Sequence, residues 1–116
     1  MHMESANIQP PELCKCLGES TRFHVVALLS RHGELCVCDL VEALALPQST
    51  VSRHLSQLRQ CGILSARRAG QWMHYELNAD LPEWAFAVIQ QLTQPAVLPE
   101  LPDACCSGPS SIKEAS

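Results

Sequence analysis

Apolar residues recur at helical spacing along most of the chain, and the clearest example lies between residues 81 and 92. There they fall at i, i+3, i+4, i+7, i+8 and i+11, which is the pattern of a helix with one apolar face. The stripe consists of Leu81, Trp84, Ala85, Val88, Ile89 and Leu92. We expect a helix that begins at Pro82, with Asp80 as its cap.

Two helices are expected near the N-terminus. The first runs from Pro10 to about Leu17, since proline is tolerated in the first helical turn. Ser20 is expected to cap a second helix, which covers residues 21–32 and ends before Gly33.

The centre of the chain has the pattern of a helix-turn-helix. A helix is expected over about residues 36–45, and Pro47 then disfavours helix at the residue before it. Gln48 or Ser49 can cap a following helix over residues 50–60. Its apolar positions fall at i, i+4 and i+7: Val51, Leu55 and Leu58. Two helices joined by a break of about four residues outline this motif, whose second helix reads DNA.

A β-hairpin is expected directly after these helices. Residues 63–69 and 71–77 predict two strands around a turn at Ala69-Gly70. A hairpin that follows a recognition helix is a wing. The pattern therefore predicts a mainly α winged helix-turn-helix fold with a β-hairpin.

The helical pattern ends at about Gln94. Four of the eight prolines lie between Pro95 and Pro109, and the end of the chain is rich in serine. We expect one DNA-binding and dimerisation domain over residues 1–94 and a flexible tail over residues 95–116. The aromatic content of 4% makes the core modest, and a dimer would bury additional apolar surface.

The distribution of charge favours a nucleic-acid partner although the net charge is −4. Residues 43–75 hold half of the eight cationic residues and none of the twelve acidic ones. A local positive surface is what phosphate contact requires. The expected DNA contacts lie at the start of the recognition helix and on the wing: Gln48, Ser49, Thr50, Ser52, Arg53, His54, Arg67 and Arg68.

The seven cysteines favour metal binding or redox sensing over a disulfide framework. No stretch approaches the roughly 20 apolar residues that span a bilayer, and the first residues lack the pattern of a signal peptide. We therefore expect a cytoplasmic protein with no membrane contact, in a compartment that keeps thiols reduced. Six cysteines form close pairs, Cys14/Cys16, Cys36/Cys38 and Cys105/Cys106, and Cys61 stands alone.

Several strings together resemble the ArsR/SmtB family of metalloregulatory repressors. They are Glu34-Leu35-Cys36-Val37-Cys38-Asp39-Leu40, Val51-Ser52-Arg53-His54-Leu55, Gly62-Ile63-Leu64 and Trp72-Met73-His74-Tyr75. The first string resembles the signature of the arsenic- and cadmium-sensing branches. The resemblance implies a homodimer that represses an arsenic-resistance operon by binding double-stranded operator DNA. It also implies release of the DNA when As(III) or Sb(III) binds to Cys36 and Cys38 as inducer.

The spacing of Cys36 and Cys38 poses a geometric problem for this chemistry. Residues i and i+2 of a regular helix point about 200° apart, so the two thiols cannot both face one ion from helical backbone. Either the pair lies just before the helix, or binding distorts the first turn. A helix N-terminus is also expected to lower the pKa of these thiols.

The third ligand is left open. In the arsenic repressors that this pattern resembles, another Cys follows the second one after three residues, and here that position is Val41. Cys14 and Cys16 could complete the set from the partner subunit, and this pair ranks slightly ahead of the tail. Cys105 and Cys106 of the tail could also complete it, or could form a separate two-thiolate site suited to organoarsenicals. Water, hydroxide or a small thiol could also fill the position. Cys61 is expected to be structural.

Three other classes of function bear on these cysteines. Four thiolates from Cys14, Cys16, Cys36 and Cys38 could make a tetrahedral site for cadmium, lead or zinc. A repressor whose thiols oxidise is a different sensing class. An enzyme is not expected, because the chain has neither a Cys-X-X-Cys motif nor a phosphate-cradling glycine-rich loop.

Overall fold

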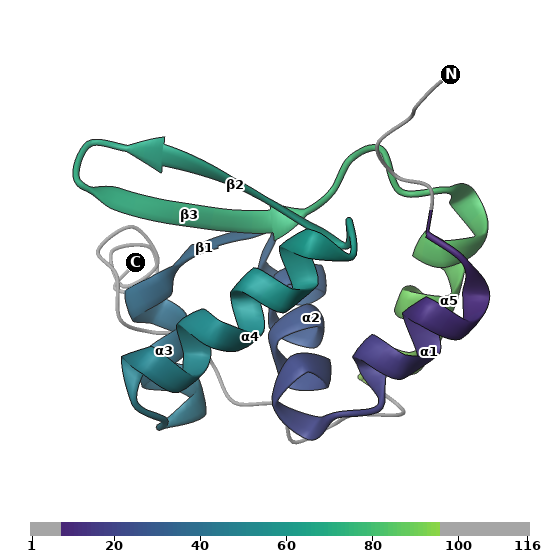
Figure 1. The fold of residues 1–116 in the computed structure, drawn as a ribbon, viewed down its shortest axis with the longest axis horizontal. Coiled ribbons are helices and arrows are strands. Elements are labelled where there is room, and N and C mark those ends of the chain that lie inside the picture. The colour runs from purple at the N-terminus through teal and green to yellow at the C-terminus, as the bar shows by residue number, and fades with distance from the viewer. Residues whose placement is uncertain (1–7, 96–116) are drawn as a thin grey trace.

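The computed structural model describes residues 8–95. Within them, five helices lie on one side of a small antiparallel sheet (Figure 1). The elements are α1 (Pro10–Leu17), α2 (Ser20–His32), β1 (Glu34–Cys36), α3 (Val37–Leu44), α4 (Gln48–Gln60), β2 (Leu64–Ala69), β3 (Trp72–Leu77) and α5 (Glu83–Thr93). The predicted winged helix-turn-helix is confirmed.

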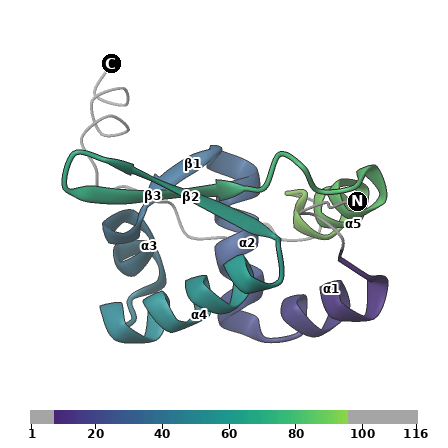
Figure 2. The same ribbon diagram turned by 45° about the horizontal axis from the view of Figure 1, so that its top comes forward.

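Helix α2 is the central element of the core. Its residues 25–29 are buried, and it packs against α1, α3, α4, α5 and the sheet. Figures 1 and 2 show α3 and α4 on one side of α2, with α1 and α5 on the other. The apolar positions expected in α4, namely Val51, Leu55 and Leu58, are fully buried. Burial against α2 therefore fixes the recognition helix in place.

The turn between α3 and α4 depends on one residue with a left-handed backbone. Ala45 ends α3 with a φ of 55° and a ψ of 43°, and its N–H donates to the carbonyl of Val41 at 2.9 Å. Pro47, not Gln48 or Ser49, is the N-cap of α4, so this helix begins earlier than expected. The predicted break between α3 and α4 is present, but it is shorter than the roughly four residues expected.

The sheet contains a strand that the sequence pattern did not predict. Its order is β1-β3-β2, with β3 in the middle and antiparallel to both neighbours. Strand β1 pairs Cys36 with His74, and β2 pairs Arg67 with the same His74. The expected hairpin is confirmed as β2–β3. The part of the chain that carries Cys36 is thus joined to the wing.

The ends of two other helices correct the predicted caps. Glu19, not Ser20, caps α2, because its longer side chain reaches the N–H of Arg22 at 2.9 Å. Pro82, not Asp80, is the N-cap of α5. Helix α1 spans the residues expected for it.

The apolar stripe of α5 separates into two rows. Leu81, Ala85 and Ile89 are buried against the core. The other row is 37–39% exposed: Trp84, Val88 and Leu92. Among the described residues, no helix has the length and apolar character needed to cross a membrane. The expected tail falls almost entirely outside the described residues.

Candidate thiol site and nucleic-acid interface

The thiols of Cys36 and Cys38 meet at the junction between β1 and α3. Together with a carboxylate oxygen of Asp39, their sulfur atoms form a group in which all ligand atoms lie within 4.8 Å of one another. Cys36 and Asp39 are buried, and Cys38 is half-buried. Two thiols and one carboxylate are a donor set that suits a soft ion better than a hard one.

The backbone resolves the geometric problem of the i, i+2 spacing. Cys36 is the N-cap of α3, with extended φ and ψ of −86° and 167°, whereas Cys38 lies in the first helical turn. The 200° separation of a regular helix therefore does not apply. Asp39 closes the turn, since its carboxylate accepts a hydrogen bond from the N–H of Cys36 at 3.1 Å.

The protonation of Cys36 differs from the expectation. Burial raises the pKa of its thiol to about 11, helped by a hydrogen bond to Cys38, and the N–H groups of Asp39 and Cys38 offset this only in part. The prediction that the helix N-terminus lowers the pKa was therefore wrong for Cys36. Desolvation of the charged thiolate outweighs the favourable dipole.

The thiol site is linked to the wing by an ion pair. Glu34, two residues before Cys36, accepts two contacts from the guanidinium of Arg67 of β2: Nε–Oε2 at 2.9 Å and Nη2–Oε1 at 3.0 Å. The ion pair spans the sheet above β3, and it raises the pKa of Arg67. Strand β1 is thus joined to the wing both by backbone pairing and by this contact.

The expected DNA contacts on α4 fall into two groups. Gln48, Ser49 and Arg53 are exposed, and Thr50 and Ser52 are half-buried. His54 is different, because its side chain is only 11% exposed and its Nδ1 lies 3.8 Å from a carboxylate oxygen of Glu19. That Nδ1 is buried without a hydrogen-bond partner. The structure therefore places His54 in the packing between α4 and α2 rather than on the outer face.

The two wing arginines also differ. Both are exposed, but the guanidinium of Arg67 is held by Glu34, whereas no ion pair or hydrogen bond of Arg68 occurs within residues 8–95. An exposed arginine at the end of a wing can reach a phosphate. Arg68 is the better placed of the two.

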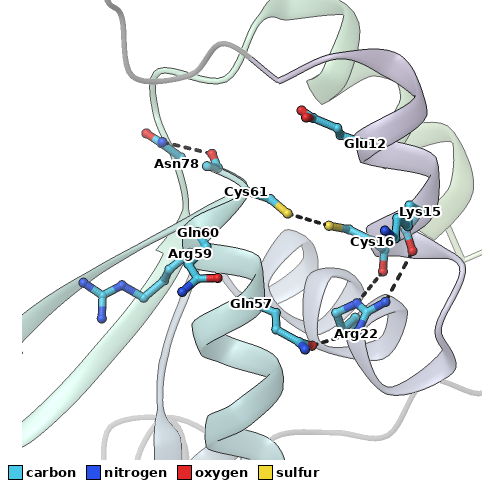
Figure 3. Close-up of a pocket in the computed structure, with 10 residues that line it drawn as sticks. Glu12, Lys15, Cys16, Arg22, Gln57, Arg59, Gln60, Cys61 and Asn78 are labelled. Atoms are coloured by element: carbon cyan, nitrogen blue, oxygen red, sulfur yellow. Dashed lines mark hydrogen bonds between the residues drawn. The ribbon is translucent and has the colours of Figure 1, made fainter.

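The remaining described cysteines do not join Cys36 and Cys38 within one chain. Cys14 is exposed on α1, and Cys16 is buried with its Sγ 2.9 Å from that of Cys61 (Figure 3). In Figures 1 and 2, α1 lies across α2 from α3. Cys105 and Cys106 lie outside the described residues.

Sequence reasoning missed Asp39 and Glu34 as parts of the site, although both belong to the Glu34–Leu40 string. The signal for Asp39 was its position three residues after Cys36, which is the spacing of a capping box. The signal for Glu34 was weaker, because its contact with Arg67 depends on β1, which the apolar pattern did not predict.

Comparisons with known proteins place the chain in one family. The model of the "Bacterial regulatory protein, arsR family" matches residues 19–66. The arsenic resistance transcriptional regulator ArsR1 of Pseudomonas putida is 48% identical over 83 residues, which are 72% of this chain and 65% of that protein, slightly less than two thirds of its length. The arsenical resistance operon repressor of Escherichia coli is 43% identical over 107 residues, covering 87% of this chain and 92% of the relative.

Solved structures share the fold. Reduced HlyU from Vibrio cholerae aligns with a TM-score of 0.62 and 31% identity, covering 69% of this chain and 80% of that one. The AntR antimony-specific transcriptional repressor aligns with a TM-score of 0.59 and 27% identity, covering 94% and 86%. The family and its named relatives are transcriptional regulators rather than enzymes. By its sequence and its fold, this chain belongs to the ArsR family of bacterial transcriptional repressors.

Proposed function

We propose that this repressor binds the operator of an arsenic-resistance operon and releases it when Cys36 and Cys38 capture As(III) or Sb(III). The observation that carries the proposal is the group of two thiols and one carboxylate at the start of α3, the first helix of the helix-turn-helix. The names of the relatives, which refer to arsenic and antimony, support the choice of inducer.

The raised pKa of the Cys36 thiol favours arsenite over a divalent cation. Arsenous acid is neutral and carries hydroxyl groups, so each As–S bond forms as a thiol proton leaves with one hydroxyl as water. A divalent cation must instead displace the proton into solution, which is costly for a thiol whose pKa is about 11. The buried, protonated thiol is therefore suited to a neutral metalloid acid.

The third arsenic ligand is proposed to come from outside this group. Val41 occupies the position after the motif, and the Sγ of Cys16 lies 2.9 Å from that of Cys61. Cys14 is exposed and available to a second copy of the chain. Cys105 and Cys106 are the other candidates.

Release of DNA is proposed to follow from the position of the thiol site. Capture of an ion by Cys36 and Cys38 must draw two sulfur atoms of β1 and α3 into its coordination sphere. Helix α3 packs directly on α4, and β1 is joined to the wing through β3 and through the Glu34–Arg67 ion pair. A change at the junction of β1 and α3 therefore affects both α4 and the wing.

The proposed DNA surface consists of the outer side of α4 and the wing. Its side chains are Gln48, Ser49, Thr50, Ser52, Arg53, Arg67 and Arg68, with His54 as a packing residue beneath them. We further propose that the domain acts as a homodimer, since the exposed row of α5 offers apolar side chains that a second copy would cover.

Operator gel shifts in a metal-free buffer test the proposal, with arsenite, cadmium or zinc added. We expect wild type to release the operator with arsenite, and Cys36→Ser and Cys38→Ser to bind DNA but not respond. Cys61→Ser is the control that retains the response. If Cys36→Ser and Cys38→Ser both respond like wild type, the inducer site lies elsewhere. A response to cadmium or zinc but not arsenite would replace the proposed inducer.

The same assay identifies the third ligand. A Cys14→Ser variant and a Cys105→Ser/Cys106→Ser variant should differ, with the larger loss of arsenite response in the variant that lacks the ligand. Responses like that of wild type in both variants would mean that neither segment supplies it.

A further inference from the structure

Cys16 and Cys61 form a second pair of thiols, separate from Cys36 and Cys38. Their sulfur atoms lie 2.9 Å apart although the residues are 45 positions apart in the chain (Figure 3). Cys16 is buried on α1, and Cys61 is half-buried at the C-cap of α4. The contact therefore joins the first helix to the end of the recognition helix.

The backbone on both sides of this contact is held by hydrogen bonds. Arg22 donates from Nε to the carbonyl of Cys16 at 3.0 Å and from Nη1 to Oε1 of Gln57 at 2.9 Å. This one side chain therefore links α1 and α2 to α4. Asn78 donates to the carbonyl of Gly62, next to Cys61, at 3.0 Å. The two thiols are thus brought together by the fold and are not two side chains that meet by chance rotation.

The surroundings of the pair are unsuited to a metal ion. The thiols lie in a pocket of about 670 Å³ whose charged lining residues are Lys15, Arg22, Arg59 and a single acid, Glu12. A zinc ion with Zn–S bonds of about 2.3 Å would hold two sulfurs about 3.7 Å apart and would require further ligands. Among the described residues, the group of three ligands lies elsewhere, at Cys36, Cys38 and Asp39.

The surroundings of Cys16 and Cys61 favour an uncharged disulfide over a pair of thiolates. Burial, and then the hydrogen bond and charge of Cys61, raise the pKa of the Cys16 thiol to about 12, so two thiolates are disfavoured there. A disulfide carries no charge and escapes this penalty. Its S–S bond of about 2.05 Å requires the sulfur atoms to approach by only about 0.9 Å.

We propose that Cys16 and Cys61 form a reversible disulfide under a hydroperoxide oxidant, linking α1 to the C-terminal end of the recognition helix. Cys61, the more exposed thiol, attacks the peroxide oxygen and becomes a sulfenic acid as the alcohol or water leaves. The sulfur of Cys16 then displaces the sulfenic hydroxyl, which departs as water with the Cys16 proton. One hydroperoxide is reduced by two electrons for each disulfide formed.

This inference goes beyond the proposed function and does not depend on it. Cys61 follows the C-terminal end of α4, whereas Cys36 and Cys38 lie at the start of α3, the helix that leads into the N-terminal end of α4. Oxidation at Cys16 and Cys61 would therefore reach the DNA-reading helix from the opposite end. The chain would then have two separate thiol sites, each of which acts on α4.

Mass spectrometry of the full chain tests the proposal. Metal-free protein is treated with hydrogen peroxide at a stoichiometric ratio, the free thiols are alkylated, and the peptides are analysed. We expect a peptide that links Cys16 to Cys61, about 2 Da lighter than the sum of the two reduced peptides and lost on treatment with a reductant. The apparent Tm should also rise by more than about 5 °C, since the cross-link closes a long loop.

Matched variants separate this site from the other cysteines. Cys61→Ser and Cys16→Ala should lose both the linked peptide and the rise in Tm. Cys14→Ser, which removes an exposed thiol of the same helix, and Cys36→Ser/Cys38→Ser should keep both. The proposal is overturned if Cys16 and Cys61 are alkylated after peroxide treatment. It is equally overturned if either one is instead linked to Cys14, Cys105, Cys106 or a second chain.

Discussion

At the scale of single residues, Cys36 has a structural and a chemical task at once. It caps α3, and burial raises the pKa of its thiol to about 11. At neutral pH this thiol therefore holds its proton until a ligand removes it. The consequence for binding depends on whether the incoming species can take up that proton.

The pH dependence of binding should therefore distinguish arsenite from cadmium. Below the raised pKa of the Cys36 thiol, cadmium binding to this thiol releases one proton, so the affinity should rise about tenfold per pH unit from this thiol alone. Arsenite removes the same proton as water, and its affinity should hardly change between about pH 6 and pH 8. Competition titrations of metal-free protein at several pH values measure both slopes. A slope for arsenite equal to that for cadmium would refute this account.

Asp39 is expected to matter for folding as well as for the thiol site. It is buried, and its carboxylate accepts a hydrogen bond from the N–H of Cys36 at 3.1 Å. Asp39→Ala should lower the free energy of unfolding by about 1–2 kcal/mol because the cap is lost. Asp39→Asn keeps an acceptor and should lose less. Urea denaturation measures both, and Glu42→Ala, an exposed acid of the same helix, should change little.

The sequence predicted which residue types form the thiol site but not how they are oriented. The ligand candidates Cys36 and Cys38 could be named from their string, whereas the extended backbone at Cys36 could not. That backbone comes from pairing with His74, almost forty residues away. The burial of His54 escaped prediction for the same reason, since its neighbour Glu19 lies on another helix. Long-range contacts determine both the extended backbone at Cys36 and the burial of His54.

At the scale of elements, the turn of the helix-turn-helix holds a strained residue. Ala45 has a φ of 55°, which costs a residue with a Cβ atom about 1 kcal/mol relative to glycine. Ala45→Gly should therefore raise the free energy of unfolding by about 0.5–1 kcal/mol. Ala43→Gly, within α3, is the matched control and should lower it by about 1 kcal/mol. Urea denaturation that gave both substitutions the same sign would contradict the strain at Ala45.

The two wing arginines should contribute unequally to operator binding. Arg68→Ala should weaken binding and reduce the slope of log affinity against log salt by about one, the effect of losing one phosphate contact. Arg67→Ala should have a smaller effect, because Glu34 already holds this guanidinium. Fluorescence anisotropy over a range of salt concentrations measures both. Lys15→Ala, an exposed position on α1, controls for the loss of a positive charge. A larger effect at Arg67 than at Arg68 would reverse the assignment.

The elements themselves were largely predictable, with one informative exception. The helices and the hairpin follow from apolar spacing, which is strong over ten or more residues. Strand β1 has only three residues, too few to establish an alternating pattern, and it forms because β3 offers a free edge. The helix caps were missed because a cap depends on the reach of one side chain, as Glu19 shows.

At the scale of the whole molecule, α5 divides its apolar residues between two partners. The row of Leu81, Ala85 and Ile89 packs into the core, whereas Trp84 and Val88 remain more than a third exposed on the next row. Periodicity alone could not divide the stripe, because both rows belong to one broad apolar face. A second copy of the chain that covered the exposed row would remove this apolar surface from water.

Substitution of the exposed row should therefore separate dimerisation from folding. Val88→Glu places a charge where a second copy would pack, and we expect a monomer in analytical ultracentrifugation with an unchanged helical circular dichroism spectrum. Operator affinity should fall strongly, since a monomer contacts only one half-site. Gln90→Glu, an exposed polar position on the opposite face of the same helix, controls for the added charge and should remain a dimer. A Val88→Glu protein that stays dimeric and binds the operator normally would show that the subunits meet elsewhere, and Cys14 of a second copy would then need another route to Cys36 and Cys38.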